Sequence, residues 1–386
     1  MPAERVRPRV LFYVQHLLGI GHLARASRIA QGLNAHGLDT LLVTGGPAVG
    51  SFPPASVQTV ILPVIRSADT GFSGIVDEGG APVTDVYMAR RRDRLVEIFR
   101  ESRPDAVMIE AFPFGRRQVR GELLALLEAA RHAHPRPVIA ASIRDIVQPP
   151  SKPGRARETI ATVNDFFDLL LVHGDPAFAP LEASFPDVSA LRAKIAYTGL
   201  VAGPPPGKSP ETFDVIVSAG GGAAMGRLAR AAVEARKGSL LDDARWCVIT
   251  GPNAPRDTVE GLERHLRPGD LLAPFRADLP ALFLEAKLSI SQAGYNTCCD
   301  LLRSRCAMVL VPFAEGSEKE QTIRSARLEA LGRAAVVPEK SLTAEALRAA
   351  MDRAMTLSPE PLAVSLEGAA ATAALLKEAI SAARSA

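Results

Sequence analysis

The sequence is poor in cysteine, in aromatic residues and in long apolar runs. Its 386 residues include 4 cysteines and 1 tryptophan, and aromatic residues make up 5% of the chain. The cysteines lack CxxC spacing and partnering histidines, so we expect reduced, buried thiols rather than a zinc site or disulfides. No apolar run approaches the roughly 18 residues of a membrane helix, and the charged N-terminus lacks a signal-peptide core. We therefore expect a cytoplasmic protein.

An excess of charge of one sign is also missing. The chain holds 45 Lys and Arg against 42 Asp and Glu, a net charge of +3, which is far from the dense basic field of a nucleic-acid-binding protein. Arginines gather locally at 90–94 and at 116–120. These groups form either solvated helix faces or a contact with an anionic membrane surface or an acidic substrate. Nucleic acid is not expected as a partner.

Short apolar runs alternate with segments of helical periodicity along the whole chain. Buried parallel strands joined by helices produce this alternation, so the fold class is α/β with doubly wound, Rossmann-like sheets. Strands are expected at 9–15, 38–43, 57–62, 105–110, 137–142, 169–173, 195–198, 213–218, 245–250, 270–274, 288–291 and 307–311. The Gly- and Asp-rich stretch 67–83 is expected to be a loop, and the alanine-rich tail from 343 to be helical.

The stretch 199–207, GLVAGPPPG, is the richest in proline and glycine and is expected to be a hinge. It separates a first domain, 1–200, from a second, 201–365, and a last helix, 366–386, is expected to pack back on the first domain. Glycine turns between a strand and a helix occur in both domains, as Gly19–His22 and Ser218–Ala224. Such turns either bind phosphate at the helix N-terminus or serve packing alone. His22 is either a general base or a neutral residue at a helix start.

A third turn, at Gly294, is followed by Asn296, Thr297 and Asp300. The Asp300 carboxylate can accept hydrogen bonds from a ribose diol, or it complements the helix dipole. Glu320 and Arg324 are spaced i, i+4 on the next helix, as a surface ion pair or as polar contacts to a sugar together with Gln321.

The order of these motifs resembles the GT-B glycosyltransferases, most of all family 28. SAGGGAAMG (218–226) is similar to the family's diphosphate-binding loop, and FRADLP (275–280) to the turn that reads uracil. SQAGYNTCCD (291–300) resembles the turn and helix that hold the ribose, and VPF (311–313) with the following helix resembles the contact to the donor sugar. GIGH resembles the family's N-terminal glycine loop, although it is shorter, so peptidoglycan synthesis itself is not expected.

The resemblance implies two Rossmann-like domains facing across a cleft, and an inverting, metal-independent hexosyl transfer from a UDP-sugar without any cofactor. It implies that His22, or else Glu110, is the catalytic base. The implied donor-binding residues are Ser218, Gly220, Gly221, Gly222, Ala223, Phe275, Arg276, Gly294, Asn296, Thr297, Asp300, Glu320, Gln321 and Arg324. The implied acceptor-side residues are Gly19, Gly21, Arg25, Phe112 and Arg116. The expected partners are a nucleotide sugar, a lipid- or metabolite-linked acceptor and an anionic membrane surface, at the inner face of the plasma membrane.

Three alternatives stay open. GIGHLARA also resembles the GxGHxxR stretch of UDP-sugar hydrolases of pseudaminic acid synthesis, in which the histidine activates water. A UDP-sugar 2-epimerase and a non-enzymatic nucleotide-sugar-binding protein are the other two.

Overall fold

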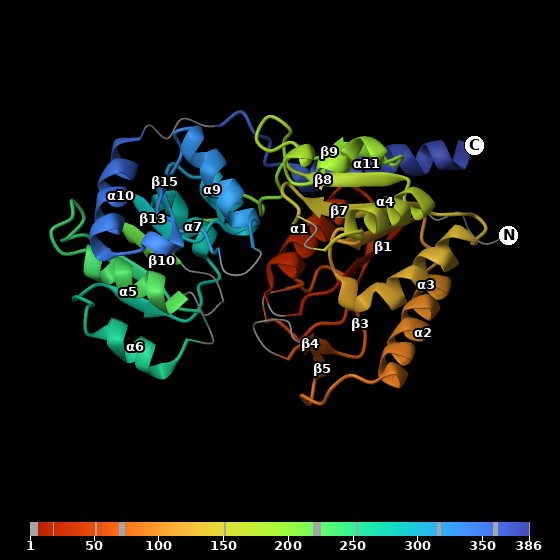
Figure 1. Ribbon diagram of the computed structural model, residues 1–386, viewed down its shortest axis with the longest axis horizontal. Coiled ribbons are helices and arrows are strands. Elements are labelled where there is room, and N and C mark those ends of the chain that lie inside the picture. Colours follow the sequence, from red (N-terminus) through yellow and green to blue (C-terminus); the bar gives the residue numbers. More distant parts are fainter. Residues whose placement is uncertain are drawn as a thin grey trace. The chain divides into compact units, whose positions relative to one another are not determined.

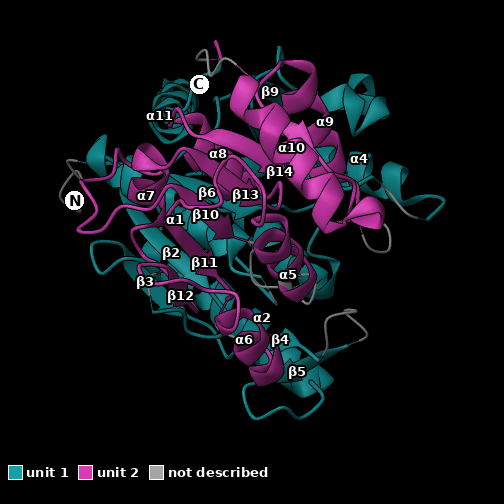
Figure 2. Cartoon of the chain, turned by 90° about the vertical axis from the view of Figure 1, so that its left-hand side faces the viewer, with its two compact units in different colours: residues 1–202, 364–386 teal, residues 203–363 magenta. Residues whose placement is uncertain are grey.

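The computed structural model describes residues 7–17, 19–50, 52–68, 74–149, 152–218, 225–251, 254–314, 318–357 and 362–385. The chain forms two compact units, coloured separately in Figure 2. The N-terminal unit comprises residues 1–202 and 364–386, and the C-terminal unit comprises residues 203–363. Both chain ends therefore belong to the N-terminal unit.

The N-terminal unit is built on a seven-stranded sheet in the order β3-β2-β1-β6-β7-β8-β9. All neighbouring strands in it are parallel. The strands are β1 (Arg9–Val14), β2 (Asp39–Thr44), β3 (Gln58–Ile61), β6 (Ala106–Glu110), β7 (Val138–Arg144), β8 (Leu169–His173) and β9 (Lys194–Tyr197). The central strands are buried along almost their whole length, as short apolar runs predict.

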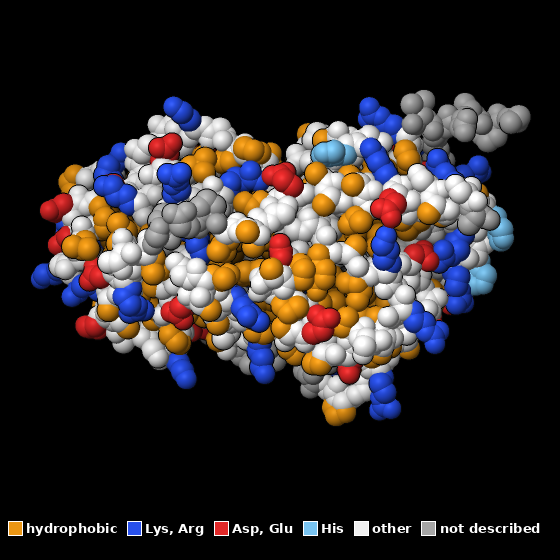
Figure 3. Space-filling model, turned by 90° about the horizontal axis from the view of Figure 1, so that it is seen from above, with side chains coloured by type: hydrophobic (Ala, Val, Ile, Leu, Met, Phe, Trp, Pro, Cys, Tyr) orange, Lys and Arg blue, Asp and Glu red, His pale blue; other side chains and the backbone are white. Residues whose placement is uncertain are grey.

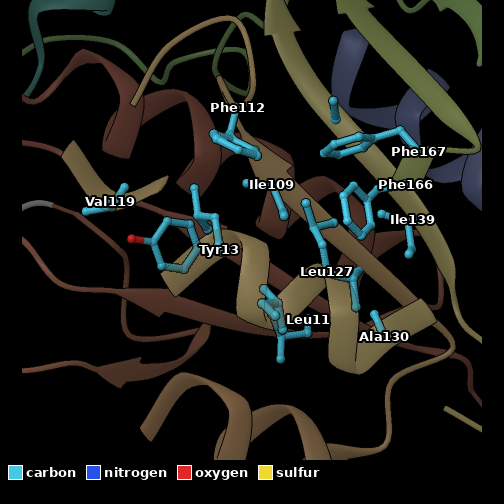
Figure 4. Packing of buried hydrophobic residues seen from close by; sticks show 14 of the residues in the cluster. Leu11, Tyr13, Ile109, Phe112, Val119, Leu127, Ala130, Ile139, Phe166 and Phe167 are labelled. Carbon is cyan, nitrogen blue, oxygen red and sulfur yellow. The ribbon is translucent and has the colours of Figure 1, made fainter. Parts of the chain in front are cut away.

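Helices cover both faces of this sheet. They are α1 (Gly21–Ala35), α2 (Asp85–Ser102), α3 (Arg120–Arg131), α4 (Arg155–Phe166) and α11 (Gly368–Ser385). Leu11 and Tyr13 of β1 pack in one cluster with apolar residues of α2, α3 and α4, and Figure 4 shows Phe112 in the same cluster, with Phe166 and Phe167. Since side chains alternate across a strand, Val10 and Phe12 face the opposite side, where α1 packs against β1 and α11 against α1.

The C-terminal unit has a six-stranded parallel sheet in the order β12-β11-β10-β13-β14-β15. Its strands are β10 (Val215–Ser218), β11 (Trp246–Ile249), β12 (Leu271–Ala273), β13 (Leu288–Ser291), β14 (Ala307–Leu310) and β15 (Ala335–Val336). Its helices are α5 (Met225–Ala235), α6 (Arg256–Glu263), α7 (Leu279–Glu285), α8 (Tyr295–Leu302), α9 (Glu320–Ala330) and α10 (Ala344–Thr356). The labels of Figure 1 follow both series. The α/β, doubly wound fold class is confirmed.

One expectation about local structure was wrong. The stretch 67–83 is not only a loop, because β4 (Ile65–Ser67) and β5 (Ile75–Asp77) pair antiparallel across it. The alanine-rich tail is helical over α10, which belongs to the C-terminal unit, and over α11, which belongs to the N-terminal unit. Proline cannot donate a backbone hydrogen bond inside a helix, and the sequence between these two helices contains Pro359 and Pro361.

The side-chain chemistry of both units is that of ordinary globular domains. All four cysteines are free and buried, and burial raises the pKa of Cys306 to about 12. Among the residues that the structure describes, no helix combines the length and hydropathy of a membrane span. Lys and Arg side chains alternate with Asp and Glu over the face shown in Figure 3.

Candidate functional site

Each sheet reverses its strand order at its centre. In the N-terminal unit the reversal lies between β1 and β6, and in the C-terminal unit between β10 and β13. Ligands of open α/β sheets bind at the carboxyl ends of the strands at such reversals. The sequence motif GIGH lies between β1 and α1, and SAGGGAAMG begins at Ser218, the last residue of β10, so each motif follows a strand that borders a reversal.

In the N-terminal unit His22 and Glu110 meet at the reversal, although 88 residues separate them. His22 is the second residue of α1, and Glu110 is the last residue of β6. The His22 Nδ1 atom lies 2.8 Å from Glu110 Oε1, and the Arg25 guanidinium donates to the same oxygen. Glu110 is fully buried, whereas the His22 side chain is 15% exposed. The buried Glu110 carboxylate therefore holds the His22 imidazole in a fixed position, where part of the ring can contact a ligand.

The protonation state of His22 follows from this setting. Burial, followed by the charges of Arg116, Arg144 and Arg25, lowers the pKa of His22 well below its usual range. The imidazole is therefore neutral at pH 7, and its contact with Glu110 is a hydrogen bond from Nδ1–H to the carboxylate. This tautomer leaves the Nε2 lone pair available to accept a proton.

Three buried residues that the sequence did not single out stand behind Glu110. The Ser142 hydroxyl donates to Glu110 Oε2 at 2.6 Å and lies 2.9 Å from His173 Nε2. His173 Nδ1 is in turn 2.9 Å from Thr198 Oγ1. Burial, followed by Arg25, lowers the pKa of His173 well below its usual range. A signal was present, since Ser142 and His173 are the last residues of two predicted strands. Their importance becomes visible only once the strand order places these strands next to one another on one side of β6.

The remaining acceptor-side candidates lie around this pair. Gly19 precedes α1 with open space where a Cβ would stand, and Gly21 is the first residue of α1. Phe112 is buried in the core below the loop that follows β6. Arg116 ends that loop in a left-handed conformation, with φ at 61°. All of them belong to the carboxyl end of the sheet.

The arginine cluster at 90–94 is divided rather than uniformly exposed. Arg91 is fully buried and forms an ion pair with Glu122, at 2.8 Å. It also donates to Gln15 and to the carbonyl of Gly45. Arg91 was expected on a solvated helix face or at a membrane surface. This expectation is wrong, because Arg91 lies on the face of α2 that packs against the core.

In the C-terminal unit Ser218 ends β10 directly beside Ser291, the last residue of β13. Both are buried. The predicted diphosphate loop, including Gly220, Gly221, Gly222 and Ala223, lies outside the described residues. Its two flanks are nevertheless placed, by β10 before it and α5 after it.

The predicted uracil turn follows β12. Phe275 is 49% exposed, an unusual position for an aromatic side chain. Arg276 is held by Asp278, at 2.8 Å from both carboxylate oxygens, and by Glu211 at 2.6 Å. This pairing lowers the pKa of Asp278 to about 2. The Arg276 side chain therefore braces the turn.

The α8 helix presents its predicted ribose-binding residues on one side. Asn296, Thr297 and Asp300 are partly exposed, whereas Tyr295 and Cys299 are buried. The spacing i, i+1, i+4 places the three polar side chains on a common face. Gly294 precedes them as the N-cap residue.

Glu320 and Arg324 form a buried ion pair rather than a surface one. Arg324 Nη2 donates to Glu320 Oε1 at 2.7 Å, and its Nη1 donates to the carbonyl of Ala293 at 2.9 Å. Gln321 accepts a hydrogen bond from the backbone of Phe313 at 3.1 Å. These residues tie α9 to the loops after β13 and β14, and their donor-binding roles stay predictions. Within the described ranges no group of three or more His, Cys, Asp or Glu residues could hold a metal ion.

Comparison with known proteins identifies the kind of domain in the C-terminal unit and the fold of the chain. Residues 220–380 match the glycosyltransferase family 28 C-terminal domain. A UDP-N-acetylglucosamine–N-acetylmuramyl-(pentapeptide) pyrophosphoryl-undecaprenol N-acetylglucosamine transferase of Rhodospirillum centenum is 36% identical over 100 residues, which is 26% of this chain and 26% of that enzyme. The likeness thus spans about a quarter of the relative.

Solved structures match over nearly the whole chain. The calicheamicin glycosyltransferase CalG4 has a TM-score of 0.62 at 13% identity, covering 99% of this chain and 98% of that one. MurG of Acinetobacter baumannii has a TM-score of 0.56 at 14% identity, covering 96% of this chain and 100% of that one. At such identities the match shows the shared fold alone. The chain therefore has the GT-B fold, and its residues 220–380 match the family 28 C-terminal domain.

Proposed function

We propose that the chain is a glycosyltransferase that moves a sugar from a UDP-sugar to an acceptor hydroxyl. The observation that carries the proposal is the His22–Glu110 pair at the strand-order reversal of a chain whose other unit carries the family 28 domain. The name of the relative from Rhodospirillum centenum gives UDP-N-acetylglucosamine as the donor of that enzyme. This nucleotide sugar is therefore the first to test. Its acceptor is linked to pyrophosphoryl-undecaprenol, which supports a lipid-linked acceptor here.

The proposed chemistry assigns the base to His22. The neutral imidazole takes the proton of the acceptor hydroxyl at Nε2 while the oxygen attacks the anomeric carbon and the UDP group departs. Glu110 fixes the tautomer and stabilises the imidazolium that forms. General base catalysis of this kind contributes typically ~10²–10⁴ in rate. Glu110 itself is too deeply buried to meet the acceptor.

The proposed donor site lies at the carboxyl end of the C-terminal sheet. Asp300 receives the ribose hydroxyls from the same α8 face as Asn296 and Thr297. The N-terminus of α5, reached through the glycine loop, stabilises the departing diphosphate without a metal. The exposed ring of Phe275 belongs to the turn that is predicted to contact the uracil base. Contact with an anionic membrane is a separate proposal, now carried by Arg90, Arg92 and Arg94, which are exposed on α2.

Donor binding is tested first by thermal unfolding with UDP-N-acetylglucosamine. A ligand at 100 times its Kd stabilises the folded protein by ~2.7 kcal/mol, so the midpoint should rise. Turnover is then followed as UDP release with a polyprenyl-phosphate-linked sugar as acceptor. His22→Asn should reduce turnover by ~10²–10⁴ while leaving the donor-induced thermal shift intact.

His36→Asn is the matched control, because His36 is exposed at the other end of α1. It should leave turnover unchanged. Unreduced turnover in His22→Asn would reject the base assignment. UDP and free sugar released at full rate without acceptor would identify a hydrolase instead.

A further inference from the structure

Glu339, which the sequence did not single out, joins two segments of the C-terminal unit that flank the predicted donor site. Its Oε1 atom accepts a hydrogen bond from Arg227 Nη2 at 2.6 Å. Its Oε2 atom accepts a hydrogen bond from the backbone N–H of Ala314 at 3.0 Å. Arg227 lies in the first turn of α5, and Ala314 belongs to the loop that follows β14. One carboxylate thus connects the start of a helix with the loop of a neighbouring strand.

The Glu339 carboxylate is fixed by the backbone that carries it. Glu339 is the first residue of a short 3-10 turn, Glu339–Ser341, and directly follows Pro338. The backbone N–H of Val337 donates to the carbonyl of Leu310 at 3.0 Å, which holds this segment to the end of β14. The Glu339 side chain is 9% exposed. Because both the backbone and the side chain are restrained, the carboxylate can set the position of the groups that bond to it.

The loop after β14 is held from two sides. Phe313 and Ala314 are consecutive, and their backbone N–H groups donate to two different side chains, to Gln321 at 3.1 Å and to Glu339 at 3.0 Å. Gln321 comes from α9, whereas Glu339 comes from the connection between β15 and α10. A charged acceptor forms the stronger hydrogen bond of such a pair. Glu339 therefore contributes at least as much as Gln321 to the orientation of this loop.

The charge at the start of α5 is consistent with this arrangement. A cation in the first turn of a helix is unfavourable, because that end of the helix dipole is positive. α5 begins with Met225, Gly226 and Arg227, so its first turn carries a positive charge and no acid. The Glu339 carboxylate offsets this charge from outside the helix. The Arg227 side chain is 60% exposed, so of the two contacts of Glu339 the bond to the Ala314 backbone matters more.

We propose that Glu339 is a positioning residue for the sugar of the donor. Through the N–H of Ala314 it orients the loop after β14, so that this loop and Gln321 can bind the sugar. The inference rests on the proposed function and on the predicted contact of residues 311–313 and Gln321 with the donor sugar. The uracil and the ribose are assigned to other segments, the turn 275–280 and α8. Removal of the Glu339 carboxylate should therefore weaken binding of a UDP-sugar and leave binding of UDP unchanged.

Calorimetry with UDP, UDP-N-acetylglucosamine and UDP-glucose tests this role in the full chain. Glu339→Ala should weaken binding of the preferred UDP-sugar about tenfold, the loss of one hydrogen bond to a charged acceptor, and change the Kd for UDP less than about twofold. Glu339→Gln keeps an acceptor for the Ala314 N–H and should lose about threefold or less. Glu339→Asp keeps the charge on a shorter side chain. It should behave like Glu339→Ala and replaces it if the alanine variant fails to fold.

Glu329→Ala is the matched control. The Glu329 carboxylate also accepts a backbone hydrogen bond, from Val336 at 3.1 Å, but it lies near the end of α9. This control should keep both affinities, and Arg227→Gln should change neither by more than about twofold, because an exposed ion pair contributes little. Circular dichroism verifies that every variant is folded.

The outcomes separate this inference from the donor assignment on which it rests. If Glu339→Ala weakens UDP and the UDP-sugar equally, or weakens neither, the positioning role is overturned while the donor assignment stands. If the original protein binds neither UDP nor a UDP-sugar, the donor assignment fails and the positioning role fails with it. A loss confined to the UDP-sugar and recovered in Glu339→Gln supports the role, because general destabilisation of the fold does not distinguish the two ligands.

Discussion

At the scale of single residues, the site depends on hydrogen bonds that reach across four strands. Glu110 ends β6, Ser142 belongs to β7, His173 ends β8, and Thr198 directly follows β9. The hydroxyl of Ser142 can donate only once, and it donates to Glu110, so it accepts from His173 Nε2–H. These hydrogen bonds fix the orientation of the Glu110 carboxylate. Through Glu110 they also fix the tautomer of His22.

Ser142→Ala should therefore lower kcat without changing the KM for the donor. Loss of a hydrogen bond to a charged group corresponds to about 1.5–3 kcal/mol, or roughly ten- to hundredfold in rate if it is expressed in the transition state. The acid limb of the kcat/KM profile should also shift, because Glu110 sets the basicity of His22. Ser142→Thr, which keeps the hydroxyl, should recover part of the rate.

The matched control is Ser102→Ala, at a buried serine that bonds to the Phe99 carbonyl at the end of α2. It should leave the pH profile unchanged. A purely structural role for Ser142 would lower stability in Ser142→Ala while kcat and the pH profile stay as they were.

At the scale of elements, the helix that carries His22 and Arg25 is positioned by the last helix of the chain. α1 packs against α11, and a Cβ built on Gly32 would stand 2.5 Å from the Cβ of Ala369. The backbone of Ala369 is also within 3.4 Å. The two helices thus approach at a distance that only glycine allows, and residues more than 300 positions apart set the position of the base.

Gly32→Ala should destabilise the protein by about 1–3 kcal/mol, because overpacking displaces α1 from α11. Turnover should fall as well, since α1 carries His22. Chemical unfolding and the UDP-release assay measure the two effects. Gly121→Ala, in α3, adds the same methyl where nothing lies within 4 Å, and should be neutral or stabilising by up to about 1 kcal/mol. Equal destabilisation by both changes would contradict the close packing of α1 and α11.

At the scale of the whole molecule, buried titratable groups are distributed unevenly between the units. The pKa values of His16, His22 and His173 are all lowered, mainly by burial, and all three belong to the N-terminal unit. In the C-terminal unit, hydrogen bonds from Lys287 and Arg276 lower the pKa values of Asp214 and Asp278. The two units should therefore respond to acid in different pH ranges.

Between pH 7 and pH 5 the N-terminal unit should lose stability and the C-terminal unit should not. A histidine whose folded pKa is depressed binds fewer protons when folded, so stability falls as pH drops below the unfolded value of ~6.5. The aspartates of the C-terminal unit lose their contribution only below the unfolded value of ~3.9.

The single tryptophan, Trp246, is buried in the C-terminal unit, so its fluorescence reports the unfolding of that unit. Its midpoint should stay constant from pH 7 to pH 5, while a calorimetric transition of the N-terminal unit moves to lower temperature. His173→Asn should reduce that shift. The prediction would be contradicted if the unfolding midpoint measured by Trp246 fluorescence fell between pH 7 and pH 5 by as much as the calorimetric midpoint of the N-terminal unit.

A feature of the fold or of the site could be predicted from the sequence when residues close together along the chain determine it. Strands such as 105–110 and 169–173 are local apolar runs, and the turns at GIGH and SAGGGAAMG mark the strand ends at which open sheets bind ligands. The α/β fold class, the positions of the strands and the family 28 likeness follow from such local signals. The hairpin across 67–83 did not, because strands this short carry too few residues for a periodic pattern.

The sequence by itself determined the two α/β series, the places of the glycine turns and the histidine at the first of them. Only the tertiary structure decided which polar groups meet. It paired His22 with Glu110, placed Ser142 and His173 behind them, and buried Arg91 and the Glu320–Arg324 pair. The reason is physical: periodicity fixes which side of its own strand or helix a residue faces, whereas strand order and helix packing fix what stands opposite.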